Sequence, residues 1–269
     1  MRKNILFLII FLTFETLQAQ YFSNIANTIY EDIEISICDG LGFITAPTRM
    51  DNSDALLFTG VGLSTFYMIH HDGYIRSLLN SEVDEYQNNF WIALEAYGVV
   101  QYAEAIGGLT YSIGLFAQHE KTRVLGRMII QSLTYSGATA MFMRMIAGRK
   151  RPPFTKDPLN FIGFTTNNSY QSFPSGHTTV AFALSTVLAE YFDETWSRIL
   201  FYGIAGLSAT ERYINNSHWF TDIALGAALG YVSGLYVINS EKKRNNNSIL
   251  NNLSISPTLN GISLIYRLN

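Results

Sequence analysis

Three short groups of arginine, serine, histidine and aspartate residues lie in the second half of the chain. They are Arg144 with Arg151-Pro152, then Pro174-Ser175-Gly176-His177, and then Arg212 with His218 and Asp222. Taken singly, each group is ordinary, because cationic side chains, Ser-Gly turns and His–Asp pairs are common at helix ends. Their occurrence together, in order and at the ends of expected helices, predicts one shared site.

The cationic and Ser-Gly residues suit a bound anion. Ser175 and Gly176 begin an expected helix, whose free N–H groups and positive end attract negative charge. Gly176 allows close approach of the backbone, and the Ser175 hydroxyl adds a donor. Arg144, Arg151 and Arg212 stay charged and bind phosphoryl oxygens in a forked geometry. Such a cage can replace the charge neutralisation that Mg²⁺ supplies elsewhere, so we expect no metal and no cofactor.

Two histidines and one aspartate supply the reacting groups. His218 and Asp222 are one helical turn apart, so the carboxylate could hold one ring N–H and leave the other nitrogen free for attack. His177 follows the Ser-Gly pair and could protonate the leaving oxygen. Together with the cage, these groups predict hydrolysis of a phosphate ester through a phosphohistidine.

The order of these residues resembles the signature of the type 2 phosphatidic acid phosphatases, a superfamily that also contains the vanadium haloperoxidases. That signature reads Lys-x6-Arg-Pro, Pro-Ser-Gly-His and Ser-Arg-x5-His-x3-Asp. The resemblance implies a six-helix bundle without a metal, with His218 as the nucleophile and His177 as the acid. It also implies a set of phosphate-binding residues, namely Arg144, Arg151, Ser175, Gly176 and Arg212.

Two positions depart from that signature. Arg144 occupies the lysine position and keeps the charge, but its longer fork could shift the phosphate. Glu211 occupies the serine position beside Arg212. Pointing inward it would partly neutralise the cage, and we expect it to point outward. Neither change removes the nucleophile, the acid or the orienting carboxylate, so we expect an active enzyme.

The composition is typical of a helical protein in or against a membrane. Only 14% of the 269 residues are charged, against about 25% in soluble domains, and the mean hydropathy is slightly positive. A net charge of -3 gives no basic field, so nucleic acid is not an expected partner. Cys38, the one cysteine, allows no intramolecular disulfide.

We expect four segments along the chain. Residues 1–20 contain Arg2 and Lys3, a short apolar run and small residues, which is typical of an export signal or a retained signal anchor. Residues 21–53 form a polar N-terminal segment without a strong period. Residues 54–239 form the helical phosphatase domain, and residues 240–269 form a solvated linker and a hairpin about Asn260-Gly261.

The fold class that we expect is all-α, a membrane-embedded six-helix bundle followed by a short C-terminal β-hairpin. The expected helices are the apolar segments at 54–70, 90–117, 123–147, 177–192, 197–211 and 219–239. The second of them could break at Gly107-Gly108. Glu95 and Glu104 interrupt this helix, and we expect them to pair within the bundle rather than to bind a metal.

The distribution of basic residues predicts an active site that faces outward, toward the periplasm. Lys121, Arg123 and the basic run 242–244 lie opposite the catalytic end, and positive residues tend to stay in the cytoplasm. Six simple crossings would then conflict with a cleaved signal. Three arrangements remain open: a retained signal with a re-entrant segment, a double crossing by 90–117, or a soluble exported phosphatase.

The substrate and the activity also have alternatives. A phosphorylated lipid, such as an isoprenoid diphosphate or lipid A, would fit a membrane site, whereas a small phosphomonoester would fit a soluble protein. The chain could instead be a vanadium-dependent haloperoxidase, with vanadate at the nucleophile. It could also be a catalytically silent membrane or assembly protein whose C-terminal hairpin is the working part.

Overall fold

The structure, a computed structural model, describes residues 2–78, 89–258 and 261–266, with side chains described within 20–78 and 89–246. Within these residues the chain is almost entirely helical. The α-helices are α1 (Arg2–Ile44), α2 (Asn52–Leu78), α3 (Asn89–Tyr97), α4 (Val100–Phe116), α5 (Glu120–Ala147), α6 (Gly176–Phe192), α7 (Thr195–Ile214) and α8 (Phe220–Asn252). Three short 3₁₀ helices are η1 (Ala46–Arg49), η2 (Pro152–Phe154) and η3 (Asn168–Tyr170). The predicted all-α fold class is confirmed.

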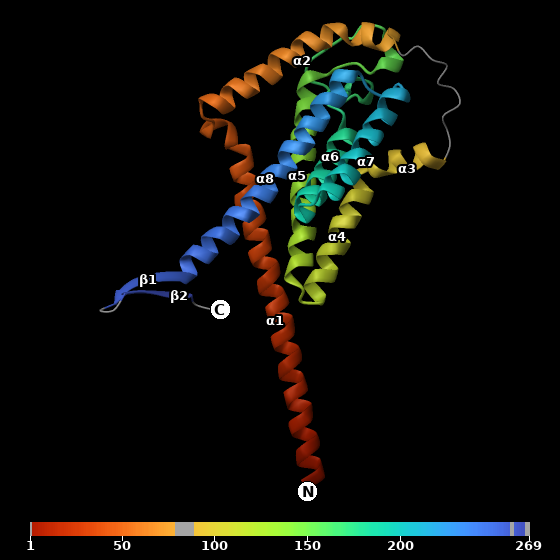
Figure 1. The fold of residues 1–269 in the computed structure, drawn as a ribbon. Helices are drawn as coiled ribbons and strands as arrows, with labels where there is room; N and C mark the ends of the chain where they lie inside the picture. The colour runs from red at the N-terminus through yellow and green to blue at the C-terminus, as the bar shows by residue number, and fades with distance from the viewer. Residues whose placement is uncertain (1, 79–88, 259–260, 267–269) are drawn as a thin grey trace.

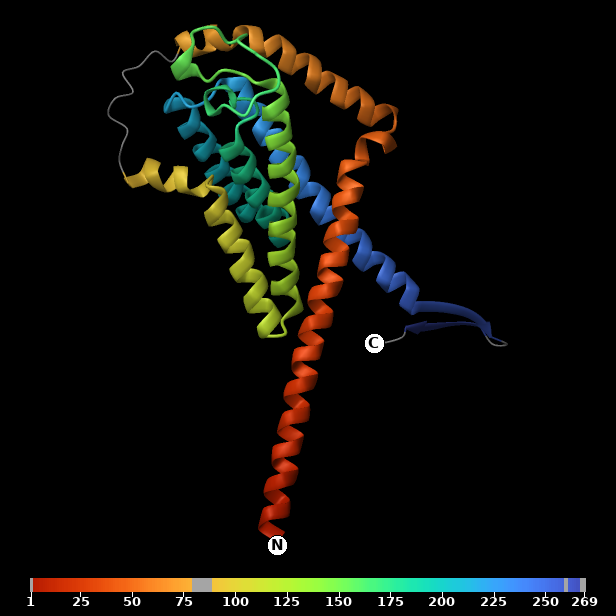
Figure 2. The same cartoon turned by 180° about the vertical axis from the view of Figure 1, so that it is seen from behind.

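Helices α4 to α8 run lengthwise and form the bundle, as both Figure 1 and Figure 2 show. Helix α1 runs beside α5 and α8, and its N-terminal part extends past the end of the bundle. Helix α2 lies across the opposite end, above the long loop between α5 and α6 and the first turns of α8. The first helix expected for the bundle, 54–70, is therefore a cover over one end of it.

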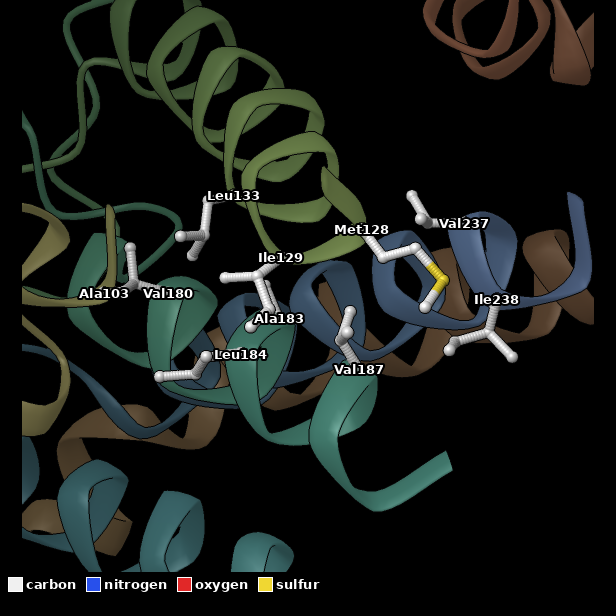
Figure 3. Packing of buried hydrophobic residues seen from close by; sticks show 10 residues of the cluster. All are labelled: Ala103, Met128, Ile129, Leu133, Val180, Ala183, Leu184, Val187, Val237 and Ile238. Carbon is white, nitrogen blue, oxygen red and sulfur yellow. The ribbon is translucent and has the colours of Figure 1, made fainter. Parts of the chain in front are cut away.

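The core lies where α4, α5, α6 and α8 meet, and Figure 3 shows its side chains interlocking between the helices. Its buried members are Ala103, Met128, Ile129, Leu133, Val180, Ala183, Leu184, Val187, Val237 and Ile238. Burying aliphatic side chains at this density supplies most of the free energy that holds helices together. The helices that carry the sequence motifs are thus fixed to one another by the core.

Helices α6 and α8 approach each other along a stripe of glycines on α8. Gly226, Gly230 and Gly234 are spaced four residues apart and therefore share one face of the helix. A Cβ added at Gly226 would lie 2.6 Å from Ser175 O, and one at Gly230 would lie 2.3 Å from Thr179 O. Both distances are shorter than any normal contact, so only glycine permits this approach of the two backbones.

The helix break predicted at Gly107-Gly108 is wrong. The chain leaves the helix earlier, because α3 ends at Tyr97 and α4 begins at Val100. Gly107 is buried inside α4, and a Cβ added to it would lie 2.9 Å from Ile129 Cγ2 on α5. This glycine lets two helices pack closely, which a local sequence pattern cannot distinguish from a break.

The N-terminal segment 21–53 showed no helical period, yet the helix α1 continues to Ile44. Some of its polar side chains pair with α5, whereas others, such as Asn24 and Glu31, are exposed. Asp32 is buried and accepts hydrogen bonds from Arg127 Nη1 at 3.0 Å and from Arg123. A polar residue that faces a partner helix breaks the apolar period without breaking the helix.

The solvated linker predicted after residue 240 is also wrong over 241–252, because α8 continues to Asn252. Arg127 donates to Glu241 at 2.6 Å, and Arg244 donates to Asp39 on α1 at 2.8 Å. These ion pairs attach the charged end of α8 to its neighbours.

Two strands follow α8 in the structure. β1 (Leu253–Thr258) and β2 (Gly261–Tyr266) pair antiparallel, with Leu253 opposite Tyr266 and Thr258 opposite Gly261. Asn260, the first residue of the expected turn, lies outside the described residues.

Candidate active site

The predicted site residues meet at the end of the bundle that α2 covers. They come from the last turn of α5, the long loop 148–175, the first turn of α6, the last turn of α7, and the residues that begin α8. The loop leaves α5 sharply at Gly148, whose φ of 57° is left-handed and suits glycine. The bundle therefore supplies the framework, and the loop completes one side of the site.

The half of the site that is predicted to bind an anion, called the anion-binding half below, is built around the start of α6. Ser175 is the N-cap, and its Oγ accepts a hydrogen bond from Thr178 Oγ1 at 3.0 Å. Its backbone N–H donates to Asp222 O at 2.9 Å, which ties α6 to α8. A Cβ added at Gly176 would lie 3.0 Å from Arg144 Nη1. The Arg144 guanidinium thus rests on the backbone at the positive end of α6.

Arg151 interacts electrostatically with both other arginines of the predicted cage. It is held by main-chain carbonyls of the loop, through Nε to Asn168 O at 3.2 Å and through Nη2 to Gln171 O at 3.3 Å. Burial lowers the pKa of Arg151, the charge of Asp222 raises it, and the nearby cation Arg212 lowers it. Arg144 is repelled in turn by Arg151. Three cations are therefore brought together, which favours a bound anion.

Arg212 is paired with two carboxylates, those of Glu211 and Glu95. The position of Glu211 differs from the one predicted. Glu211 was expected to point outward, but it is buried, and it accepts hydrogen bonds from Arg212 Nε and from Asn215 Nδ2 at 2.8 Å. These two donors on the same helix end compensate for the burial of the carboxylate. Glu95 on α3 lies 2.9 Å from Arg212 Nη2, so its predicted pairing within the bundle is confirmed.

His218 is buried and its ring is fixed by the loop. Nδ1 lies 2.9 Å from Ser172 O and 3.6 Å from Asp222 Oδ2. A carbonyl oxygen can only accept, so Nδ1 carries the proton and Nε2 of the neutral ring has a free lone pair. Burial lowers the pKa of His218, and Asp222 raises it. The ring N–H is thus held mainly by a main-chain carbonyl, with the carboxylate at longer range.

The carboxylate of Asp222 has a full set of donors. Arg149 Nη1 donates to it at 2.6 Å, Trp219 N donates at 2.9 Å, and the Ser172 hydroxyl donates to Oδ2. Ser172 therefore contacts both members of the His–Asp pair, through its carbonyl and through its hydroxyl. A carboxylate with this many partners has little freedom to turn.

His177 lies near both halves of the site. Burial lowers its pKa to about 4, with smaller contributions in the same direction from Arg212 and His218, whereas Glu95 raises it. Negative charge brought among these cations would act in the opposite direction and favour the protonated ring.

Comparison with known families finds a match for part of this chain. Residues 125–246 match the model of the PAP2 superfamily. This part of the chain is therefore similar to the PAP2 superfamily. The matched stretch contains all eight predicted site residues, from Arg144 to Asp222. Glu95 comes from outside it.

Curated proteins similar to this chain include lipid A 1-phosphatases. The one from Porphyromonas gingivalis is 40% identical over 72 residues, which is 26% of this chain and 16% of the relative. The one from Rhizobium johnstonii is 28% identical over 108 residues, which is 39% of this chain and 43% of the relative. The chain thus spans less than half the length of these relatives.

Two solved structures are similar to this chain. LpxE from Aquifex aeolicus has a TM-score of 0.44 and 20% identity, and the match covers 58% of this chain and 90% of LpxE. A transmembrane PAP2-type phosphatidylglycerolphosphate phosphatase from Bacillus subtilis has a TM-score of 0.49 and 16% identity, and the match covers 77% of this chain and 96% of that one.

Sequence reasoning missed three residues of this candidate site. Ser172 lies outside the three motifs, and Arg149 lies in the basic run that precedes Arg151, where nothing distinguished it from its neighbours. Asp72, on α2, bonds Arg149 Nη2 at 2.7 Å, and it precedes the matched stretch altogether. Only the basic run offered a signal, because it holds more arginines than the motif needs. Among the described residues, no group of three or more His, Cys, Asp or Glu side chains could hold a metal ion.

Proposed function

We propose that the chain is a metal-independent phosphatase that hydrolyses a phosphate ester of a lipid through a phosphohistidine on His218. The observation that carries this proposal is the hydrogen bond from His218 Nδ1 to Ser172 O. It directs the lone pair to Nε2, so the ring is a nucleophile before any substrate arrives. Three arginines and the start of α6 then supply the positive charge that a phosphoryl group needs.

The reaction has two steps. In the first, Nε2 of His218 attacks phosphorus, the bond from phosphorus to the ester oxygen breaks, and His177 gives that oxygen its proton. In the second, water attacks phosphorus, His177 takes a proton from the water, and the bond between phosphorus and Nε2 breaks, which returns the lone pair to His218 and releases inorganic phosphate. Asp222 and the Ser172 carbonyl stabilise the positive ring of the intermediate. Arg144, Arg151 and Arg212 hold the equatorial oxygens in both steps.

The first step needs a protonated His177, whose pKa is lowered to about 4 mainly by burial. A phosphate dianion in the cage favours the protonated ring, because it opposes the repulsion by Arg212 and His218. Binding of the substrate therefore favours the protonated form of His177 that the first step requires.

A lipid substrate is supported by the surface near the site. The loop 148–175 exposes large apolar side chains, namely Phe154, Leu159, Ile162 and Phe164. Exposed apolar side chains gathered on one segment are typical of contact with a membrane or a lipid. The names of the curated relatives make the 1-phosphate of lipid A the first candidate, and a small phosphomonoester is the alternative.

A membrane location is supported by α8 and by charge. Within the described residues, 220–246 is the stretch long and apolar enough to cross a bilayer, and half of its most apolar window is buried inside the protein. Lys121, Lys242 and Lys243 lie at the end away from the site, which supports a site that faces outward. Retention in carbonate-washed membranes would support this location, and release into the soluble fraction would favour an exported soluble enzyme. Whether residues 1–20 are cleaved stays a prediction, which N-terminal sequencing would decide.

The test is a panel of lipid phosphates and small phosphomonoesters, assayed in EDTA for release of phosphate. Acid quenching has the drawback that phosphohistidine is acid-labile, so the intermediate is trapped by base quenching after a short reaction with ³²P-labelled substrate. His218→Ala should lower turnover by about 10⁴-fold or more and abolish the base-stable label. Turnover within tenfold of wild type, or activity that only a divalent ion restores, would overturn the mechanism.

The haloperoxidase alternative is tested on the same protein. Added vanadate should inhibit phosphate release, because its trigonal bipyramidal adduct resembles the transition state. Peroxide-dependent halide oxidation by the vanadate-loaded protein, without phosphate release from any substrate, would favour the alternative.

A further inference from the structure

A buried ionic network joins the covering helix α2 to the His–Asp pair. Its centre is Arg149, which is completely buried and donates from Nη2 to Asp72 at 2.7 Å and from Nη1 to Asp222 at 2.6 Å. Both carboxylates are completely buried as well. Burying three charges is costly unless each is closely matched, so the network is held to one arrangement.

Asp72 also holds the start of α8. Thr221 N donates to Asp72 Oδ1 at 3.1 Å, and the Thr221 hydroxyl donates to Oδ2. Arg149 Nη1 donates to the same hydroxyl at 2.8 Å. Because Thr221 directly precedes Asp222, Asp72 reaches the orienting carboxylate by two routes, through the cation and through the backbone.

We propose that Asp72 is a positioning residue of the active site and acts on His218 through Arg149 and Asp222. The proposal rests on the phosphatase function proposed above. The single charge of Arg149 faces two carboxylates, so Asp72 matches part of it and leaves Asp222 with negative charge to stabilise the positive ring of His218. Without the charge of Asp72, Arg149 and Asp222 would neutralise each other one to one.

A purely structural role for Asp72 makes a different prediction, and Arg76 is the matched control for it. Arg76 lies one helical turn farther along α2 and donates to Tyr213 O at 3.0 Å, with its guanidinium 5.0 Å from the Tyr213 ring. It therefore fastens the same helix to the corner between α7 and α8 by contacts separate from those of Arg149 and Asp222. If Asp72 serves only to attach α2, loss of Arg76 should have a similar effect.

The experiment compares four full-length variants in one detergent or vesicle preparation: Asp72→Asn, Arg76→Gln, Asp222→Asn and the double variant Asp72→Asn/Asp222→Asn. Asp72→Asn should lower kcat by about 10–100-fold, the usual effect of removing a supporting partner, and leave KM nearly unchanged. Arg76→Gln should keep kcat within about threefold. In the double variant, Asp72→Asn should add little to the effect of Asp222→Asn, because residues that act through one another are not additive.

Two results would overturn the proposal. One is an equal loss of kcat on Asp72→Asn in the wild-type and Asp222→Asn backgrounds. The other is a loss for Arg76→Gln as large as that for Asp72→Asn. If Asp72→Asn does not fold, Arg149→Lys tests the same link, since lysine keeps the charge but lacks the fork that reaches both carboxylates. A folded Arg149→Lys protein with wild-type kcat would equally overturn the proposal.

Failure of the proposed function would look different. Wild-type protein that releases no phosphate and forms no base-stable label contradicts the phosphatase assignment itself. Active wild-type protein with a fully active Asp72→Asn variant contradicts only the role of Asp72.

Discussion

The two halves of the site differ in how their charges are matched. In the nucleophile half, Arg149 and Asp222 are completely buried and bonded to each other, and the His218 ring is held by Ser172. In the anion-binding half, Arg151 donates to loop carbonyls and lies near a second cation, Arg212. The first half is matched within the protein. In the second half Arg212 is paired with Glu211 and Glu95, whereas the hydrogen-bond acceptors of Arg151 are loop carbonyls, so we expect a substrate to supply its counter-charge.

This difference indicates how the binding energy of a substrate is used. The nucleophile half needs no rearrangement, because its tautomer and its orientation are fixed by the fold. The cationic half gains most when an anion arrives, since repulsion between arginines is then relieved. Variants in the first half should therefore change kcat, and variants in the second half should change KM.

The largest effect that separates the halves is expected for Asp222→Asn. The amide keeps the size but loses the charge that stabilises the positive His218 ring, so kcat should fall by about 10²–10⁴-fold. KM should change much less than for Arg151→Ala, which removes a contact to phosphate. Steady-state kinetics on both variants checks this. If Asp222 served only as a first-turn helix carboxylate, worth about 0.3–1 kcal/mol, the Asn variant would be slightly less stable and almost fully active.

An effect of similar size, which depends on the leaving group, is expected for His177→Ala. An alkyl lipid phosphate needs a proton on its leaving oxygen, and loss of the acid should cost about 10²–10⁴-fold in kcat. p-Nitrophenyl phosphate releases a stable phenolate and should lose far less. The ratio of the two rates measures the acid role directly. Equal losses on both substrates would assign His177 to binding rather than to proton transfer.

The pH dependence gives a third contrast. The acid must be protonated, so activity is lost as pH rises through the pKa of His177, which burial lowers to about 4 in the free protein. A bound phosphoryl group raises that pKa, so the falling limb of kcat should lie at higher pH than the falling limb of kcat/KM. The pH profiles of kcat and kcat/KM test this, measured with a substrate whose ionisation does not change over the pH range. The His177→Ala variant is the control, because it should lack the falling limb. Coincident limbs would mean that the anion does not act on His177.

The smallest effect is expected for Glu211→Ser, which installs the residue of the family signature. Glu211 is bonded to Arg212 Nε, so its removal frees a cation of the cage, and KM and the inhibition constant of vanadate should fall several-fold. Glu190→Gln, which acts on an ion pair with Arg198 far from the cage, is the control. An increase in KM would show instead that Glu211 holds Arg212 in its binding position.

The motif residues could be predicted from the sequence because their spacing is local. A turn, a helix start and an i, i+4 pair each follow from a few neighbouring residues, and their order along the chain completed the inference. Asp72 could not be found in this way. It lies 77 residues from Arg149 and 149 from Thr221, and only the position of α2 across the end of the bundle brings them together.

Two errors came from reading polar residues and glycines as local signals. Glu211 was expected to avoid Arg212, but a buried carboxylate needs donors, and those donors lie on its own helix end. Gly107 was expected to interrupt a helix, but it serves a contact with Ile129. For Gly107 the deciding partner lies on another helix, whereas for Glu211 the partners are local and the burial of the carboxylate is what the sequence did not reveal.

The glycine stripe on α8 has a consequence for how the site can vary. The start of α6 carries the backbone N–H groups that are proposed to bind the anion, and the start of α8 carries Asp222. The distance between the proposed anion site and the His–Asp pair is therefore set by the spacing of these two helices. Gly230 faces Thr179 O at a distance that leaves no room for a methyl group. We therefore expect activity to depend partly on the glycines of this stripe, although they are not among the residues predicted to contact a substrate. A single carbon added at Gly230 would push α6 and α8 apart and so separate the two halves of the site, while every charged residue in the sequence stays unchanged.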